Sequence, residues 1–132
     1  MERYIKVFEH FVLESSAVLK NTADTFAEKS GINITFIETT IDGEGGCYYG
    51  FGDGEMFDQY DLDIEEQGYK VYMFVFKNNK VAFGFDANPI VIKGQKVEMV
   101  DIDSIDPMEN IYKLTDVLKV KDLRQKLADA IK

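Results

Sequence analysis

Two apolar runs flanking a short polar turn constrain the fold most. The runs are Tyr69–Phe76 and Val81–Phe85, both rich in valine and phenylalanine, and the turn is Lys77-Asn78-Asn79-Lys80. β-Branched and aromatic residues favour strands. Asparagine tolerates the positive φ that a type I′ turn requires. This stretch therefore predicts an antiparallel hairpin.

The strand pattern continues after the hairpin. Pro89 precedes another apolar run, Ile90–Ile92, and a proline at the start of a strand removes no hydrogen bond that the strand needs. Gly94-Gln95 then offers a two-residue turn into Lys96–Val100. Residues 69–101 are therefore expected to form an antiparallel meander of four strands.

Two further strands are expected upstream. Ile32–Ile41 alternates apolar and polar residues and is rich in β-branched side chains. Its alternation shifts at Phe36–Ile37, which predicts either a bulge or burial on both faces. Cys47–Phe51 has the composition of a short strand. The sheet is therefore expected to contain about five to six strands.

A helix is predicted before the sheet. Apolar residues at helical spacing run over residues 3–29, and Gly31 follows as a C-terminal stop. Polar residues near the middle leave open a kink or a division into two helices. A first strand over Tyr4–Val12 remains an alternative.

Two helices are predicted after the sheet. Asp106-Pro107-Met108-Glu109 combines an N-cap acid with proline at the first helical position, and Leu114 and Leu118 give a buried stripe. Leu123 and Leu127 indicate a second, shorter helix. The expected fold class is α+β: one domain over residues 1–132, with the N-terminal helix and both C-terminal helices packed on one face of an antiparallel sheet.

Bulk features point to the cytoplasm. No run approaches the roughly 20 apolar residues that a membrane span needs. The first residues lack the layout of a secretory signal. Cys47 is the only cysteine, which excludes an internal disulfide and favours a reducing compartment.

The acidic charge is concentrated in one window, Ser30–Tyr69. The window holds ten carboxylates and no lysine, arginine or histidine, whereas the segment before it carries −1 and the segment after it +2. The formal net charge of −9 therefore comes almost wholly from this window. A surface this negative repels phosphate backbones and anionic membranes and attracts basic proteins. We expect a basic protein partner, without direct nucleic-acid or membrane binding.

Residues 52–68 are expected to form a long acidic loop that is mobile in the free protein, because they follow no clear period. Aromatic residues alternate with the carboxylates here. Aromatic rings supply contact area at binding surfaces, and charges supply steering. Any single ring could instead belong to the core, and some are expected to tether the loop to the body.

The chain carries no complete pattern for catalysis or cofactor binding. The glycines at 50, 52 and 54 lack the lysine and the following helix of a phosphate-binding loop. The acids from Asp61 onward lack the glycine that a calcium loop needs at its sixth position. Cys47 lies among carboxylates, which disfavour the reactive thiolate, and His10 is the only histidine. No catalytic residue, metal or cofactor is assigned.

The expected function is that of an acidic inhibitor that neutralises a basic protein, most concretely a bacterial toxin-immunity (antitoxin) protein blocking a nuclease-type toxin. Three alternatives remain open: a phage-type nucleic-acid-mimic inhibitor, a small enzyme or ligand-binding protein with an acidic cleft near the glycine-rich loop, and a structural subunit. The expected partner-binding residues are the carboxylates and aromatics of the window: Glu44, Tyr48, Tyr49, Asp53, Glu55, Phe57, Asp58, Tyr60, Asp61, Asp63, Glu65 and Glu66.

Overall fold

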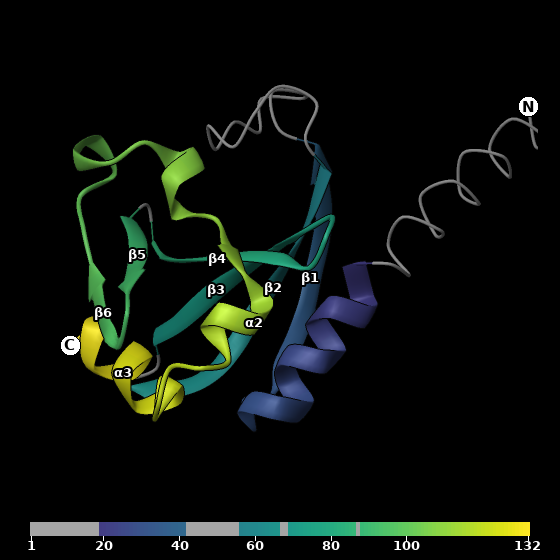
Figure 1. Cartoon of the computed structure of the whole chain (residues 1–132), viewed down its shortest axis with the longest axis horizontal. Coiled ribbons are helices and arrows are strands. Elements are labelled where there is room, and N and C mark those ends of the chain that lie inside the picture. Colours follow the sequence, from purple (N-terminus) through teal and green to yellow (C-terminus); the bar gives the residue numbers. More distant parts are fainter. Residues whose placement is uncertain (1–18, 42–55, 67–68, 87) are drawn as a thin grey trace, which may run out of the picture.

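The computed structural model describes residues 19–41, 56–66, 69–86 and 88–132 (Figure 1). The expected strand at 47–51 and residues 3–18 of the expected N-terminal helix lie outside the described residues. Residues 19–30 are helical, as the sequence predicts for them, and Gly31 follows with a φ of 73°. Its amide donates to the carbonyl of Ala27 at 3.0 Å and so ends the helix.

An antiparallel sheet forms the centre of the fold. Its order is β1-β2-β3-β4-β5-β6, so every strand pairs with its neighbour in sequence, and a short seventh strand, β7, pairs with β4. The strands are β1 Ile34–Ile41, β2 Met56–Glu66, β3 Tyr69–Phe76, β4 Lys80–Phe85, β5 Asn88–Lys93, β6 Lys96–Met99 and β7 Tyr112–Lys113. The predicted α+β class and the meander over 69–101 are confirmed.

The turns of the meander have the predicted chemistry. Asn78 and Asn79 both adopt positive φ, 65° and 57°, between β3 and β4. Gly94 adopts a φ of 62° between β5 and β6. Asparagine and glycine reach this left-handed region at the lowest cost among the amino acids.

The predicted bulge in the first strand is also confirmed. The pairing of β1 with β2 shifts between Phe36 and Glu38, so Ile37 is the extra residue. The bulge explains why the apolar alternation of β1 changes phase at this point.

The predicted loop over 52–68 is wrong for residues 56–66, which form the eleven-residue strand β2. Tyr60, Leu62 and Ile64 point into the core, whereas Asp61 and Asp63 fall on the opposite side. The strand pattern is therefore present, but a carboxylate, Asp58, at a core-facing position interrupts it.

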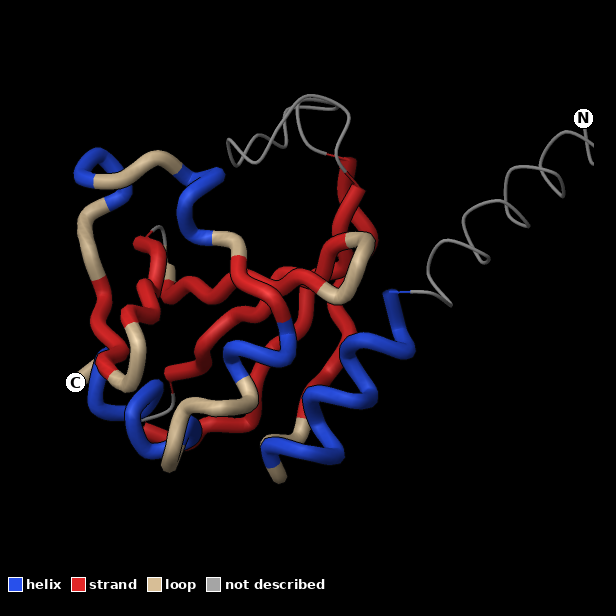
Figure 2. The backbone as a smooth tube through the Cα atoms, viewed as in Figure 1, coloured by secondary structure: helices blue, strands red, loops and turns tan. Residues whose placement is uncertain are grey.

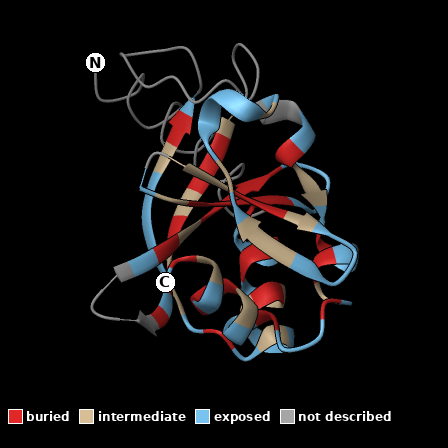
Figure 3. Ribbon diagram, turned by 90° about the vertical axis from the view of Figure 1, so that its left-hand side faces the viewer, coloured by how far each residue is buried: buried red, intermediate tan, exposed pale blue. Residues whose placement is uncertain are grey.

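The helix at 19–30 and the helices α2 (Leu114–Val117) and α3 (Leu123–Ala130) cover one face of the sheet. Leu19, Ala23 and Phe26 of the helix at 19–30 join a core cluster with α2, α3 and the inward residues of β2–β4. Figure 3 shows these buried residues along the strands and the inner sides of the helices. α3 contacts both β2 and β6, because the sheet curls around the core (Figure 1).

The opposite face, here called the helix-free face, carries a smaller apolar cluster. Alternation in β3 sends Val71, Met73 and Val75 to the helix side and Phe74 and Phe76 to this cluster. Its other members are Phe57 and Ala82, with Tyr72 and Ile111 packed against them.

The first predicted C-terminal helix is present as α2 (Leu114–Val117), but it starts later than the helix-start signal at Pro107 predicts. Figure 2 shows short helical turns and a strand over this stretch instead of one continuous helix. The 3₁₀ turn η2 (Pro107–Asn110) leads into β7, and only then does the single-turn helix α2 begin. The amide of Leu114 donates to the carbonyl of Asn79 at 2.8 Å, and Tyr112 pairs with Val81. Pairing with β4 thus takes the place of the first part of the helix. The second predicted helix is confirmed as α3.

No helix among the described residues is both long enough and apolar enough to cross a membrane.

Candidate functional site

A row of carboxylates lies on the helix-free face of the sheet at its β1–β2 edge. Asp61 and Asp63 project from β2 on the side opposite Leu62 and Ile64, which are buried. Glu38 of β1 pairs with Gln59, whose side chain lies on the same side of β2 as Asp61. We call Glu38, Asp61 and Asp63 the β-edge carboxylates.

Asp61 has the most defined surroundings of the three. It pairs with Thr35 on one side and with Tyr72 on the other. Its Oδ2 atom is 3.9 Å from the Nζ of Lys70, an exposed pair that contributes little stability. Its Oδ1 atom is shielded from solvent and accepts no hydrogen bond from the described residues. One oxygen of Asp61 therefore keeps its capacity to accept a hydrogen bond.

Asp63 is held rigidly although its side chain is exposed. Its amide donates to the carbonyl of Asn33 at 2.8 Å, and its own carbonyl accepts a 3.2 Å bond from Nη2 of Arg124 in α3. The β-edge carboxylates are therefore presented by a fixed backbone.

Three of the expected partner-binding residues are not on the surface. Phe57 is fully buried in the helix-free apolar cluster, and Tyr60 is 4% exposed on the helix side. Asp58, expected in solvent, is only 1% exposed. The physical reason is that residues 56–66 form a strand, and apolar clusters pack against both of its faces near its N-terminal end. Side chains on either face of the strand are therefore buried there.

Asp58 sits in a small polar cluster under the helix side of the sheet. Thr39 Oγ1 donates a 2.6 Å hydrogen bond to Oδ1 of Asp58, and the Tyr60 hydroxyl donates another. Burial raises the pKa of the Asp58 carboxyl above its ordinary value, and the two hydrogen bonds lower it by less. Burial and the nearby Asp58 and Asp24 carboxylates also raise the pKa of the Tyr60 hydroxyl, so it stays a donor.

The structure brings forward a second acidic stretch that the sequence analysis missed, the connection at 98–109. No lysine, arginine or histidine lies between Lys96 and Lys113, and five carboxylates do: Glu98, Asp101, Asp103, Asp106 and Glu109. The same cation-free signal that marked the Ser30–Tyr69 window could have identified it. We call these five residues the connection carboxylates.

The connection at 98–109 is an ordered surface element. Asp101 caps the 3₁₀ turn η1 (Ile102–Ser104) by accepting a 2.9 Å bond from the amide of Asp103. No residue of η1 is buried, and Ile102 is 43% exposed. Ile111, just after η2, packs on the helix-free apolar cluster. The connection carboxylates therefore lie on a segment that leads from β6 to the border of the helix-free apolar cluster at Ile111.

The remaining expected residues cannot be located. Glu65 and Glu66 end β2, and their side chains lie outside the described part. Five others are outside the described residues altogether: Glu44, Tyr48, Tyr49, Asp53 and Glu55.

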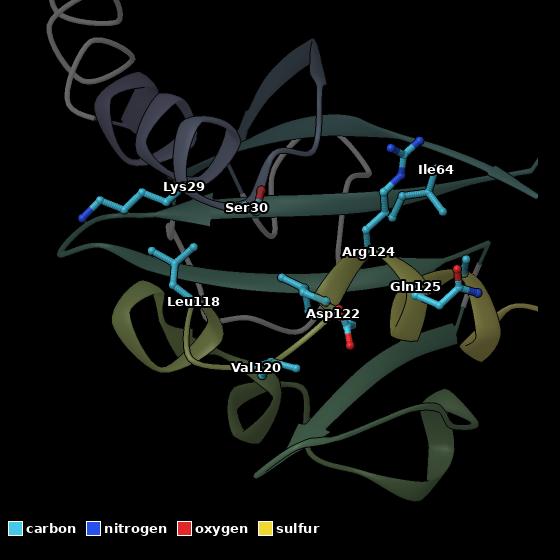
Figure 4. Close-up of a pocket in the computed structure, with 10 residues that line it drawn as sticks. Lys29, Ser30, Ile64, Leu118, Val120, Asp122, Arg124 and Gln125 are labelled. Carbon is cyan, nitrogen blue, oxygen red and sulfur yellow. The ribbon is translucent and has the colours of Figure 1, made fainter.

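A hollow of about 680 Å³ opens between the C-terminal end of the helix at 19–30, β2 and α3 (Figure 4). Its charged lining consists of Lys29, Arg124 and Asp122. The glycine-rich loop, beside which the enzyme alternative places its acidic cleft, lies outside the described residues. Among the described residues, no group of three or more potential metal ligands is clustered.

No protein-family model, curated protein sequence or solved structure matches this chain. The fold and the site together define an α+β protein whose sheet is covered by helices on one face and bordered by carboxylates on the other.

Proposed function

We propose that this protein is an acidic cytoplasmic inhibitor that neutralises a basic protein partner through the helix-free side of its sheet. The most concrete form is a toxin-immunity protein that occludes the cationic groove of a nuclease-type toxin. The observation that carries the proposal is that β2 holds Asp61 and Asp63 outward on the same side, with a packed core behind them.

The distribution of charge supports a protein partner. The formal net charge is −9, and carboxylates gather in two separate segments that contain no cation, whereas residues 111–132 carry six basic and three acidic residues. A clustered negative field raises the association rate with a positive partner. The charge also opposes binding to phosphate backbones.

Rigid presentation supports an inhibitor in particular. The β-edge carboxylates lie on paired strands, and Asp101 and Asp103 of the connection lie on a capped turn, so little ordering is needed on binding.

The test starts with affinity capture from the source cells on immobilised protein, followed by mass spectrometry. We expect a basic protein to be captured at about 50 mM salt and released at about 500 mM, because the screening length falls from about 14 to 4 Å. The purified partner is then used for association kinetics.

Three triple variants separate the surfaces at equal net charge. The first neutralises the β-edge carboxylates (E38Q/D61N/D63N), and the second neutralises part of the connection (E98Q/D103N/E109Q), leaving the Asp101 cap intact. The matched control neutralises three exposed acids near α2 and α3 (D116N/D122N/D129N). We expect the first variant to slow association by about ten-fold at low salt and the control to change it far less. If all three triple variants slowed association equally, the acidic residues would contribute only to solubility and not to a specific binding surface.

A further inference from the structure

A carboxyl group is buried on the helix side of the sheet, where β2 pairs with the edge strand β1. Asp58 lies on the same side of β2 as Tyr60, Leu62 and Ile64, which belong to the main core, and it is 1% exposed. Aspartate is among the residues least often buried in this way without a cationic partner.

The neighbours of Asp58 are hydroxyl groups and carboxylates. Thr39 on β1 donates at 2.6 Å, and Tyr60 on β2 donates through its hydroxyl. The residue paired with Asp58 on β3 is the apolar Val75. From the helix at 19–30, Asp24 adds negative charge next to Tyr60. Within the described part of the chain, no lysine or arginine forms an ion pair with Asp58.

This arrangement is easier to satisfy with a proton than without one. Two hydroxyl donors offset only part of the cost of burying a carboxylate. A protonated carboxyl carries no charge to desolvate. Burial accordingly dominates the raised pKa of Asp58.

We propose that Asp58 is a proton-sensitive latch that joins the edge strand β1 to β2 through its hydrogen bond with Thr39. With the proton bound, the latch is closed. When pH rises, the O–H bond of the carboxyl breaks and the proton passes to water. Among the described residues no cation forms an ion pair with the charge left behind, and the contact between β1 and β2 weakens.

The latch is connected to the protein surface through Tyr60 and Phe36. The ring of Phe36 on β1 packs edge-on against Tyr60 with centroids 5.5 Å apart, and Phe36 is 53% exposed. Opening of the latch therefore changes the edge strand beside the β-edge carboxylates. The latch does not depend on the proposed inhibitor function, because it follows from the buried carboxyl alone.

The sign of the effect follows from proton linkage. An acid whose pKa is raised in the folded state holds its proton longer there than in the unfolded chain. Its contribution is fully present below the unfolded pKa, near 3.8, and is lost as pH rises through the folded value. Each pH unit between the two values multiplies the local opening constant by up to about ten-fold.

The test is a carbon-13 NMR titration of side-chain carboxyls in the wild-type protein. We expect Asp58 to titrate above 3.8, the ordinary pKa of an aspartate. Amide hydrogen exchange in β1, corrected for intrinsic rates, should show opening that increases with pH. In D58N this increase should disappear, whereas D63N should retain it.

Two outcomes would overturn the latch. One is an Asp58 titration at or below the ordinary aspartate pKa of 3.8, which needs no variant and so stands even if D58N fails to fold. The other is a folded D58N protein that keeps the wild-type dependence of exchange on pH.

Discussion

The hydroxyl of Thr22 donates a 2.8 Å hydrogen bond to the side-chain oxygen of Asn79, joining the helix at 19–30 to the tip of the β3–β4 hairpin. Thr22 is 3% exposed. The backbone carbonyl of the same asparagine accepts from the amide of Leu114 at 2.8 Å. One turn residue thus contacts both the first described helix and the start of α2.

Replacing Asn79 by glycine should lower the free energy of unfolding by about 1 kcal/mol, because the buried Thr22 hydroxyl loses its acceptor. Glycine adopts the φ of 57° without strain, so the loss isolates the side-chain bond. Urea unfolding measures the change. The matched control is Asn78→Gly, at a φ of 65°, which should stay within about 0.5 kcal/mol of wild type. Equal losses in both variants would mean that Asn79 acts only as a turn residue.

Replacing Phe83 by alanine should cost about 3–5 kcal/mol, because the ring is 1% exposed and packs against Phe26 at 5.8 Å. Asp63→Asn should change the unfolding free energy by less than about 0.5 kcal/mol, since its side chain is in solvent. Thermal unfolding of the two variants gives the comparison. A larger loss from Asp63→Asn would show that the acidic face is structural.

Replacing Tyr112 by phenylalanine should cost about 1–3 kcal/mol. Its hydroxyl accepts a 2.9 Å bond from the amide of Ile92 and donates at 2.8 Å to the buried Asn110, so removal leaves both without this partner. The cost should be visible in urea unfolding at pH 7.

Tyr112 should also make the free energy of unfolding fall at alkaline pH. Burial raises the pKa of its hydroxyl, so the unfolded chain ionises first, near pH 10. The stabilisation is complete below that pH and is lost as pH rises through the folded value. Stability curves between pH 8 and pH 12 should therefore fall less steeply for Tyr112→Phe than for wild type. A parallel fall in the two proteins would contradict this assignment.

Gln95 should act as a clamp between the β5–β6 turn and the segment before α3. Its Nε2 donates to the carbonyl of Lys119 at 3.0 Å, and its Oε1 accepts from the amide of Lys121 at 2.8 Å. Gln95→Ala should cost about 1 kcal/mol in urea unfolding. Gln95→Glu keeps the acceptor and loses only the donor, so its loss should be smaller. If glutamate costs as much as alanine, the bond to Lys121 contributes nothing.

Local chemistry made much of the sheet predictable. The runs Tyr69–Phe76 and Val81–Phe85 form strands because their side chains suit a pleated surface. Asn78 and Asn79 form the turn between them because asparagine tolerates positive φ. The phase change at Phe36–Ile37 correctly indicated a bulge. Each of these depends on neighbours in sequence.

Long-range pairing made the segment at 106–119 unpredictable. Its proline and acidic residues carry a true helix-start signal, and a helical turn does begin at Pro107. The strand β7 interrupts it because Tyr112 and Lys113 meet the edge of β4, some thirty residues earlier in the chain. A pattern read within one segment cannot include the hydrogen bonds offered by another.

The sequence by itself determined the α+β class, the meander, the turns and the excess of carboxylates, because propensity, alternation and charge are properties of short segments. Only the tertiary structure decided which carboxylates face solvent. Asp58, Asp61 and Asp63 look alike in sequence, yet the pleat of β2 sends Asp61 and Asp63 to the helix-free face and Asp58 to the helix side. The pleat only alternates side chains, and the helices that cover one face fix which alternate set is buried.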